Sequence, residues 1–237
     1  MNLLLDKNLI IVTSALKPNI GVVSHEDRFT QTMDSLISLR KHLPNDYIFF
    51  TDGSPNPIEK DKLDKISKLA NIVACWDHDA DIKTLASNGQ KSQSEIVLLI
   101  KTLSAIKQNQ DLQHMMQPVK RIFKFSARST LHDTFDIKEY DNIFGKYVFK
   151  KRIPSWLPTH RQVNTTDHLF ITRMYSLCPS LMQNYFEVLI NAYNTVNDTG
   201  IDTEHAHYKH IDKQYLIEFD KLHCEGIMAG TGETETY

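Results

Sequence analysis

Charged side chains follow directly after an apolar run in the middle of the chain. The run Arg121–Phe125 is short and rich in aromatic and β-branched residues, which predicts a buried strand. Ligands of open α/β sheets bind just beyond the carboxyl ends of the strands. Four residues after the run are therefore candidates for holding a substrate: Arg128, His132, Asp133 and Asp136. A solvated loop with a surface ion pair is the alternative, because charges also cluster in purely structural networks.

The carboxylate of Asp52 is a second candidate. It follows the apolar run 47–51, which predicts another strand, and it precedes Gly53 and Ser54. At this place a carboxylate can accept hydrogen bonds from a base or ribose, while Gly53 lets the backbone turn tightly beside a ligand. A simple strand-ending turn explains the same residues, since Asp, Gly and Ser are common turn formers.

Lys91 opens a predicted helix over residues 91–107. The first turn of a helix presents unpaired N–H groups and the positive end of the helix dipole, so this turn could hold a phosphate with added charge from Lys91. No P-loop or GxGxxG pattern is present, and ordinary capping by Ser92 or Ser94 accounts for the turn as well.

Glu204 precedes three closely spaced histidines, His205, His207 and His210. On a helix His207 and His210 share a face that His205 does not, and no HExxH motif completes a zinc ligand set. Glu204 is itself a candidate general base, provided that it faces the carboxyl edge of the sheet.

Three aspartates alternate along the segment that follows the third predicted strand: Asp77, Asp79 and Asp81. Alternate carboxylates can converge on a hard cation, but the glycine and glutamate of an EF-hand loop do not follow. A solvated acidic loop is the simpler interpretation.

The order of the predicted elements places these residues in an α/β fold. Strands are expected at 8–13, 47–51 and 72–76, with helices at 29–43 and 58–70 between them. A β-α-β-α-β unit with short links predicts a mostly parallel central sheet flanked by helices, in one domain. The rest of the chain is expected to form a loop at 77–90, strands at 121–125 and 147–153, an exposed loop or flap at 154–164 and a strand or strand-turn at 167–175. Helices are expected at 179–200 and 204–211, and a mobile tail or lid at 215–237.

Composition narrows the class of protein. The 237 residues carry a net charge of -2, so the basic face typical of nucleic-acid binders is not expected. Three widely separated cysteines without a CxxC pair indicate a reducing compartment. With no signal-peptide pattern and no apolar run long enough to span a bilayer, we expect a cytoplasmic protein without a transmembrane segment.

Taken together, these motifs resemble those of glycosyltransferases of the GT-A fold, in particular small bacterial and viral ones. The segment IFFTDGS looks like the DDGS segment with which many of these enzymes bind the nucleotide base, and NGQKSQSE looks like their donor-binding turn. KFSARSTLHDTFD is similar to a K-I-S-G-R-Y-x-L-x-D-x-F segment of one subgroup, and EH followed by CEGIMAGTG resembles the carboxyl-terminal signature of that subgroup. The likeness runs from the first strand to the tail.

One departure concerns the metal. GT-A enzymes usually carry an Asp-x-Asp that holds Mn or Mg against the diphosphate, and Ser126, Ala127 and Arg128 occupy that place here. Either Arg128 supplies the positive charge directly, or a divalent metal is held further along by Asp133 or Asp136.

The resemblance implies a hexosyltransferase that moves a sugar from a nucleoside diphosphate sugar, with a UDP-sugar favoured, to a glycan or other hydroxyl acceptor. Residues 1–136 would bind the nucleotide sugar and residues 137–237 the acceptor. The implied roles are Thr13, Ser14 and Asp52 for the nucleoside, Lys91 and Arg128 for the diphosphate, Asp133 for a metal, and Glu204 as the base of an inverting reaction. The alternatives are a non-catalytic carbohydrate- or nucleotide-binding protein with a degenerate site, and a nucleotidyltransferase, although the latter needs a glycine-rich loop after the first strand.

Overall fold

A seven-stranded sheet forms the centre of the computed structural model, which describes residues 6–19, 23–162, 166–227 and 234–237. Its strands are β1 (Lys7–Ser14), β2 (Tyr47–Asp52), β3 (Ile72–Cys75), β4 (Val119–Ser126), β6 (Tyr147–Lys150), β9 (Met174–Leu177) and β10 (Leu216–Phe219). Their order across the sheet is β10-β6-β9-β4-β1-β2-β3. Strand β1 pairs in parallel with β2 and β4, and β2 with β3, whereas β9 runs antiparallel to β4 and β6.

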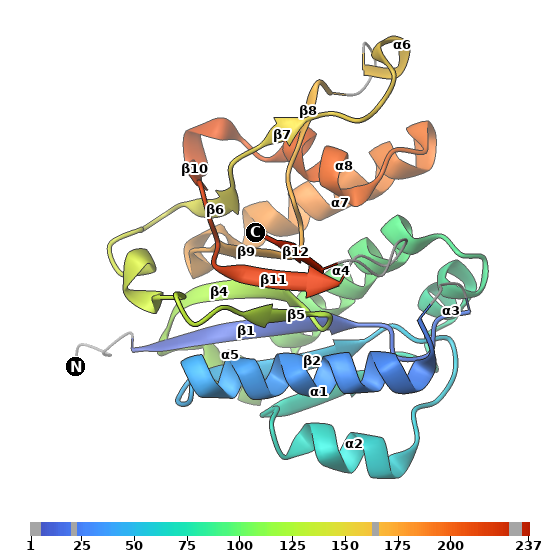
Figure 1. Cartoon of the computed structure of the whole chain (residues 1–237), viewed down its shortest axis with the longest axis vertical. Coiled ribbons are helices and arrows are strands. Elements are labelled where there is room, and N and C mark those ends of the chain that lie inside the picture. The colour runs from blue at the N-terminus through green and yellow to red at the C-terminus, as the bar shows by residue number, and fades with distance from the viewer. Residues whose placement is uncertain (1–5, 20–22, 163–165, 228–233) are drawn as a thin grey trace.

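Helices cover both faces of this sheet (Figure 1). They are α1 (His25–His42), α2 (Lys60–Ser67), α3 (Ala80–Ser87), α4 (Lys91–Gln108), α5 (Gln110–Met116), α6 (Thr159–Gln162), α7 (Met182–Thr199) and α8 (Thr203–His210), with 3-10 turns at Ile137–Tyr140, Pro179–Leu181 and Lys213–Tyr215. The predicted α/β fold with a mostly parallel sheet in a single domain is confirmed.

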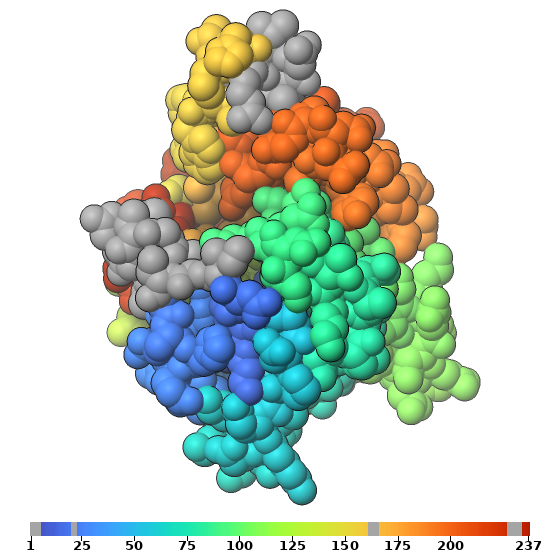
Figure 2. All heavy atoms as spheres, turned by 90° about the vertical axis from the view of Figure 1, so that its right-hand side faces the viewer, coloured from blue at the N-terminus to red at the C-terminus, as the bar shows by residue number. Residues whose placement is uncertain are grey.

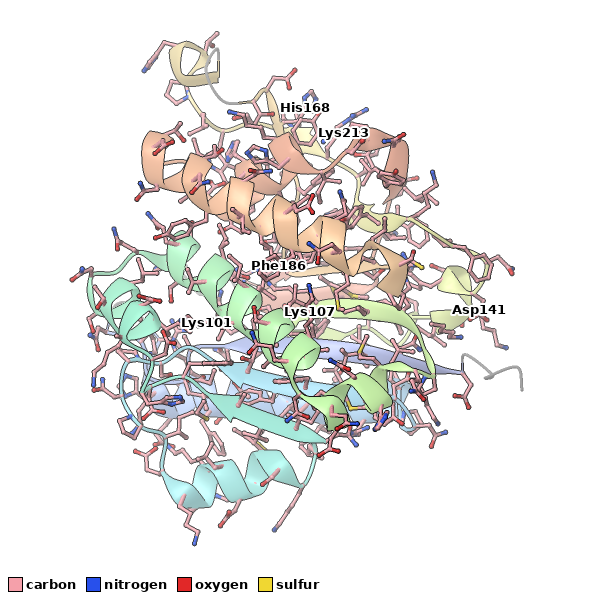
Figure 3. All side chains as sticks on the ribbon, turned by 180° about the vertical axis from the view of Figure 1, so that it is seen from behind. Lys101, Lys107, Asp141, His168, Phe186 and Lys213 are labelled. Carbon is pink, nitrogen blue, oxygen red and sulfur yellow. The ribbon has the colours of Figure 1, made fainter. Side chains whose placement is uncertain are left out.

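Alternate residues of the central strand β1 face two separate cores. Ile10 and Val12 pack in the core that α1 and α2 cover, whereas Leu9 and Ile11 pack in the core that α4 and α7 cover. This explains why β1 is apolar at successive positions, as a strand buried on both faces must be. Figure 3 shows the second face from behind, with Phe186 of α7 and Lys107 of α4 labelled where the two helices pack against each other.

Two smaller sheets extend the fold. Strand β11 (Cys224–Ile227) lies between β5 (Ser129–Leu131) and β12 (Thr234–Thr236), so the carboxyl-terminal segment returns to the loop that follows β4. Strands β7 (Ile153–Pro154) and β8 (His168–Leu169) pair beside α8 and lead to α6, at the top of Figure 1.

The structure corrects several predicted elements. The expected loop 77–90 contains α3, because Asp79 accepts hydrogen bonds from the backbone N–H groups of Asp81 and Ile82 and thereby caps a helix whose Ile82 is buried. The expected loop or flap 154–164 contains α6, and the expected strand or strand-turn 167–175 is divided between β8 and β9. The expected mobile tail includes β10, β11 and β12, while its residues 228–233 and residues 163–164 of the expected loop lie outside the described part of the chain.

Candidate active site

The carboxyl ends of β1, β2 and β4 border a cavity of about 220 Å³. The register sets Thr13 beside Thr51 and Ser126, so the three strands end at one level. The first turn of α4, residues 172–173 before β9, and Glu204 of α8 also line the cavity. Figure 2 views this side of the molecule, where the blue segment after β1, the green α3 and α4, and the orange α8 region meet.

Cationic side chains dominate this cavity. Five of them contribute to the described lining, namely Arg28, Lys91, Lys124, Arg128 and Arg173, against two carboxylates, Glu95 and Glu204. The lining therefore carries an excess of three positive charges. A concave, partly apolar site with this excess suits an anionic small molecule.

The arginines come from different segments and meet in the cavity. Arg28 lies in the first turns of α1, Arg128 lies between β4 and β5, and Arg173 precedes β9. The pKa of Arg128 is lowered to about 10, chiefly by burial and also by the charges of Arg173 and Arg28. The three guanidinium groups line the same cavity, so their charges act on one another there.

Glu95 is fixed by a lysine from the neighbouring strand. The Lys124 Nζ donates to Glu95 Oε1 at 2.5 Å and to the carbonyl oxygen of Thr172 at 2.8 Å. Burial alone would raise the pKa of Glu95, but the Lys124 ammonium outweighs it and holds the pKa below its ordinary value. Glu95 is therefore ionised at neutral pH.

Glu204 lies in a different electrostatic environment. Its Oε1 accepts a hydrogen bond from the Thr172 hydroxyl at 3.1 Å. Burial raises the pKa of Glu204 to about 6, with further contributions from the negative charges of Asp202 and Glu95. A carboxyl group with this pKa can accept a proton near neutral pH.

The three histidines beyond Glu204 are engaged in separate hydrogen bonds. His205 contacts Asp202 Oδ1 and the Ser155 hydroxyl, His207 contacts the Thr203 carbonyl and the Tyr185 hydroxyl, and His210 contacts the Thr195 hydroxyl. Burial lowers the pKa of His207 to about 4, which keeps its ring neutral. Within the described ranges no group of three or more His, Cys, Asp or Glu side chains could hold a metal ion.

Five of the predicted site residues line the cavity together: Thr13, Ser14, Lys91, Arg128 and Glu204. Asp52 lies just behind the lining and is buried. Its carboxylate accepts hydrogen bonds from the N–H groups of Leu16 at 2.9 Å and Ser54 at 2.8 Å. Asp52 thus holds the two loops that follow β1 and β2, and shapes the cavity from behind.

Asp133 is not brought to the cavity. Its side chain is 78% exposed and pairs with Lys41 at 2.6 Å. Of the alternating aspartates, Asp79 caps α3 and pairs with Lys101 at 2.6 Å, and Asp81 pairs with the same lysine at 3.1 Å. The metal role of Asp133 stays a prediction.

Sequence reasoning missed four charged residues of the cavity: Arg28, Glu95, Lys124 and Arg173. Lys124 carried a detectable signal, because a lysine between two phenylalanines of a buried strand must find a partner. Arg28 and Arg173 gave none, since they lie in segments that become neighbours only through the tertiary fold.

No protein-family model matches the chain, and none of the curated proteins does. Solved structures do match. The mannosyltransferase Ktr4p from S. cerevisiae aligns over 93% of this chain and 70% of its own, with a TM-score of 0.51 and 10% identity. Core-mannan synthase A (CmsA/Ktr4) from Aspergillus fumigatus, in its Mn/GDP form, aligns over 91% and 73%, with a TM-score of 0.50 and 7% identity.

The chain has the GT-A glycosyltransferase fold. At these identities the likeness concerns the fold alone. In the part of the chain that the structure describes, no helix combines the length and apolar character needed to cross a membrane.

Proposed function

We propose that this chain transfers a sugar from a nucleoside diphosphate sugar to a hydroxyl group of a glycan or other acceptor. The observation that carries the proposal is the cavity at the carboxyl edge of the sheet. It is lined by five cations and by two carboxylates, of which Glu95 has a lowered pKa and Glu204 a raised one. The GT-A fold supports it, because glycosyltransferases such as the Ktr4 proteins share this architecture.

The donor would lie with its nucleoside beside Thr13 and Ser14 and its diphosphate toward the cations. Lys91 stands at the first position of α4, where backbone N–H groups and the helix dipole favour a phosphate. When the bond to the sugar breaks, negative charge develops on the departing diphosphate, and cations that are already in place stabilise it. Lys91 and Arg128 are assigned to this step.

Glu204 would act as the general base of an inverting transfer. The acceptor oxygen forms a bond to the anomeric carbon while the bond from that carbon to the diphosphate oxygen breaks. The acceptor proton passes to the Glu204 carboxylate, and the bonding electrons leave with the nucleoside diphosphate. A pKa of about 6 suits this role, because the carboxylate is ionised at neutral pH and still basic enough to take a proton.

Release of the nucleotide from a panel of UDP- and GDP-sugars, with and without simple glycoside acceptors, tests this function. The sequence favours a UDP-sugar and the Aspergillus enzyme was solved with GDP, so both series are needed. We expect acceptor-stimulated release from one donor, and about a tenfold loss of kcat/KM in Lys91→Ala. Lys83→Ala, an exposed lysine on α3 outside the cavity, is the matched control. Binding without release would support the non-catalytic alternative, and no binding would overturn the proposal.

A further inference from the structure

We infer that Arg28, Arg128 and Arg173 bind the diphosphate of the donor directly, so that this chain needs no divalent cation for nucleotide binding. The inference rests on the proposed function only for the identity of the ligand. The guanidinium groups themselves are features of the cavity.

Arg28 is the first argument. Its side chain lines the cavity although the residue is only 7% exposed. Its Nε has no hydrogen-bond partner among the described residues. Burying a cationic donor without a partner is costly, so a side chain held in this way points to an anion that completes the site.

The arrangement of the three arginines is the second argument. Arg28 and Arg173 both lower the pKa of Arg128 by their charge, and of the carboxylates Glu95 contributes in the opposite direction. Glu95 is already bound to Lys124. An anion between the guanidinium groups would relieve this repulsion. Planar guanidinium forks match phosphate oxygens in pairs, which an ammonium cannot do.

A divalent cation does not fit the same residues. In nucleotide sites such a cation takes oxygen ligands, with one or two protein carboxylates beside water and phosphate oxygens. Of the two carboxylates in the described lining, Glu95 is bound by an ammonium, and Glu204 is assigned to the acceptor proton. Both oxygens of Asp52 accept backbone N–H groups, and Ser126, Ala127 and Arg128 stand where an Asp-x-Asp is usual. The cavity thus offers cations for a diphosphate, whereas the Aspergillus enzyme was solved in an Mn/GDP form.

Isothermal titration of the full chain with UDP, GDP and inorganic pyrophosphate, each in EDTA and in MnCl2, tests the inference. For the wild type we expect the Kd of the bound nucleotide in EDTA and in MnCl2 to agree within about twofold, since no step of binding uses the metal. Arg28→Gln and Arg128→Gln should each weaken binding in EDTA by about tenfold to a hundredfold, as expected for a lost charge-assisted hydrogen bond. Arg152→Gln is the control, because Arg152 pairs with Glu218 outside the cavity.

Arg28→Lys keeps the positive charge and removes the planar fork, so it separates geometry from charge. We expect the Kd of Arg28→Lys in EDTA to lie between those of the wild type and Arg28→Gln, with an unchanged melting temperature. If Arg28→Gln does not fold, Arg28→Lys and Arg128→Gln decide the question.

The outcomes separate this inference from the proposed function. Binding that requires Mn, or binding in EDTA that is unaffected by the arginine variants, would overturn the inference and leave the transferase proposal intact. Failure of every nucleotide to bind in either buffer would overturn both. Metal-independent binding that the arginine variants weaken supports the inference even if no acceptor is found.

Discussion

The two walls of the cavity hold one carboxylate each, and their environments are opposite. On the wall built by α4 and β4, Glu95 contacts the Lys124 ammonium at 2.5 Å and its pKa is lowered. On the wall built by α8, Glu204 accepts a hydrogen bond from a neutral hydroxyl, that of Thr172, and its pKa is raised to about 6. Thr172 joins the two walls, since its carbonyl accepts from Lys124 and its hydroxyl donates to Glu204.

This difference assigns different work to two residues of similar chemistry. A carboxylate that is bound to a buried ammonium stays ionised and fixes the position of that ammonium. A carboxylate that is buried without a cation exchanges its proton near neutral pH. Pairs of acids whose pKa values are driven apart by their surroundings are typical of active sites that need one charged and one proton-accepting group.

Removal of the Lys124 ammonium should have the largest effect. Lys124→Met leaves Glu95 without its cation in a partly buried place. We expect a loss of about 3 kcal/mol in the free energy of unfolding, the low end for a broken buried pair, because the Glu95 side chain is 33% exposed. Urea denaturation followed by circular dichroism measures it.

Glu95→Gln is the matched control for this variant. It keeps the hydrogen bond from Lys124 to the Thr172 carbonyl and removes only the negative charge. We therefore expect it to lower the free energy of unfolding by less than Lys124→Met does. The double variant should recover part of the loss of Lys124→Met. Additive losses in the double variant would mean that the pair is not coupled.

Glu204→Gln should lower the rate of transfer by about a hundredfold or more, the usual contribution of a general base. In the wild type, kcat/KM should rise with pH through about 6, because the base works only after it has lost its proton. The variant should show no such rise. If Glu204→Gln keeps both the wild-type rate and the wild-type pH profile, Glu204 is not the general base.

The same substitution has a readout that does not depend on activity. Glu204 binds its proton more tightly in the folded chain, with a pKa of about 6 against an ordinary value of 4.5. The folded state therefore loses stability as the pH rises from about 4.5 to about 6, by on the order of 2 kcal/mol. Glu204→Gln should lack this loss and be more stable than the wild type at pH 7, but not at pH 4.

The elements and site residues that the sequence predicts correctly are those marked by local patterns. The parallel half of the sheet followed from apolar runs such as 8–13 and 47–51, which are continuous because those strands are buried on both faces. Lys91 and Glu204 were found because helix starts and strand ends are recognisable in a sequence. The helix α3 was missed because its capping residue, Asp79, was interpreted as part of an acidic loop.

The remaining part of the site depends on long-range contacts that no local pattern records. Glu95 and Lys124 are 29 residues apart, and their pairing follows from the packing of α4 on the sheet to which β4 belongs. Arg28 lies in the first turns of α1, and only the tertiary fold brings it to the cavity. For Asp52 the chemistry was recognised correctly as hydrogen-bond acceptance, but the donors in this structure are the backbone of Leu16 and Ser54.

The smallest effect is expected at a third carboxylate, Asp133, which lies outside both walls. Its side chain is exposed and paired with Lys41, a surface contact of the kind that contributes little. If the cavity cations bind the diphosphate, Asp133→Asn should leave the Kd for the nucleotide within about twofold of the wild type, in EDTA and in MnCl2 alike. Lys41→Ala is the control, because it breaks the same ion pair and keeps the Asp133 carboxylate. Both variants are titrated with the nucleotide in the two buffers. A loss of Mn-dependent affinity in Asp133→Asn alone would place a metal at Asp133, which is the role predicted from the sequence.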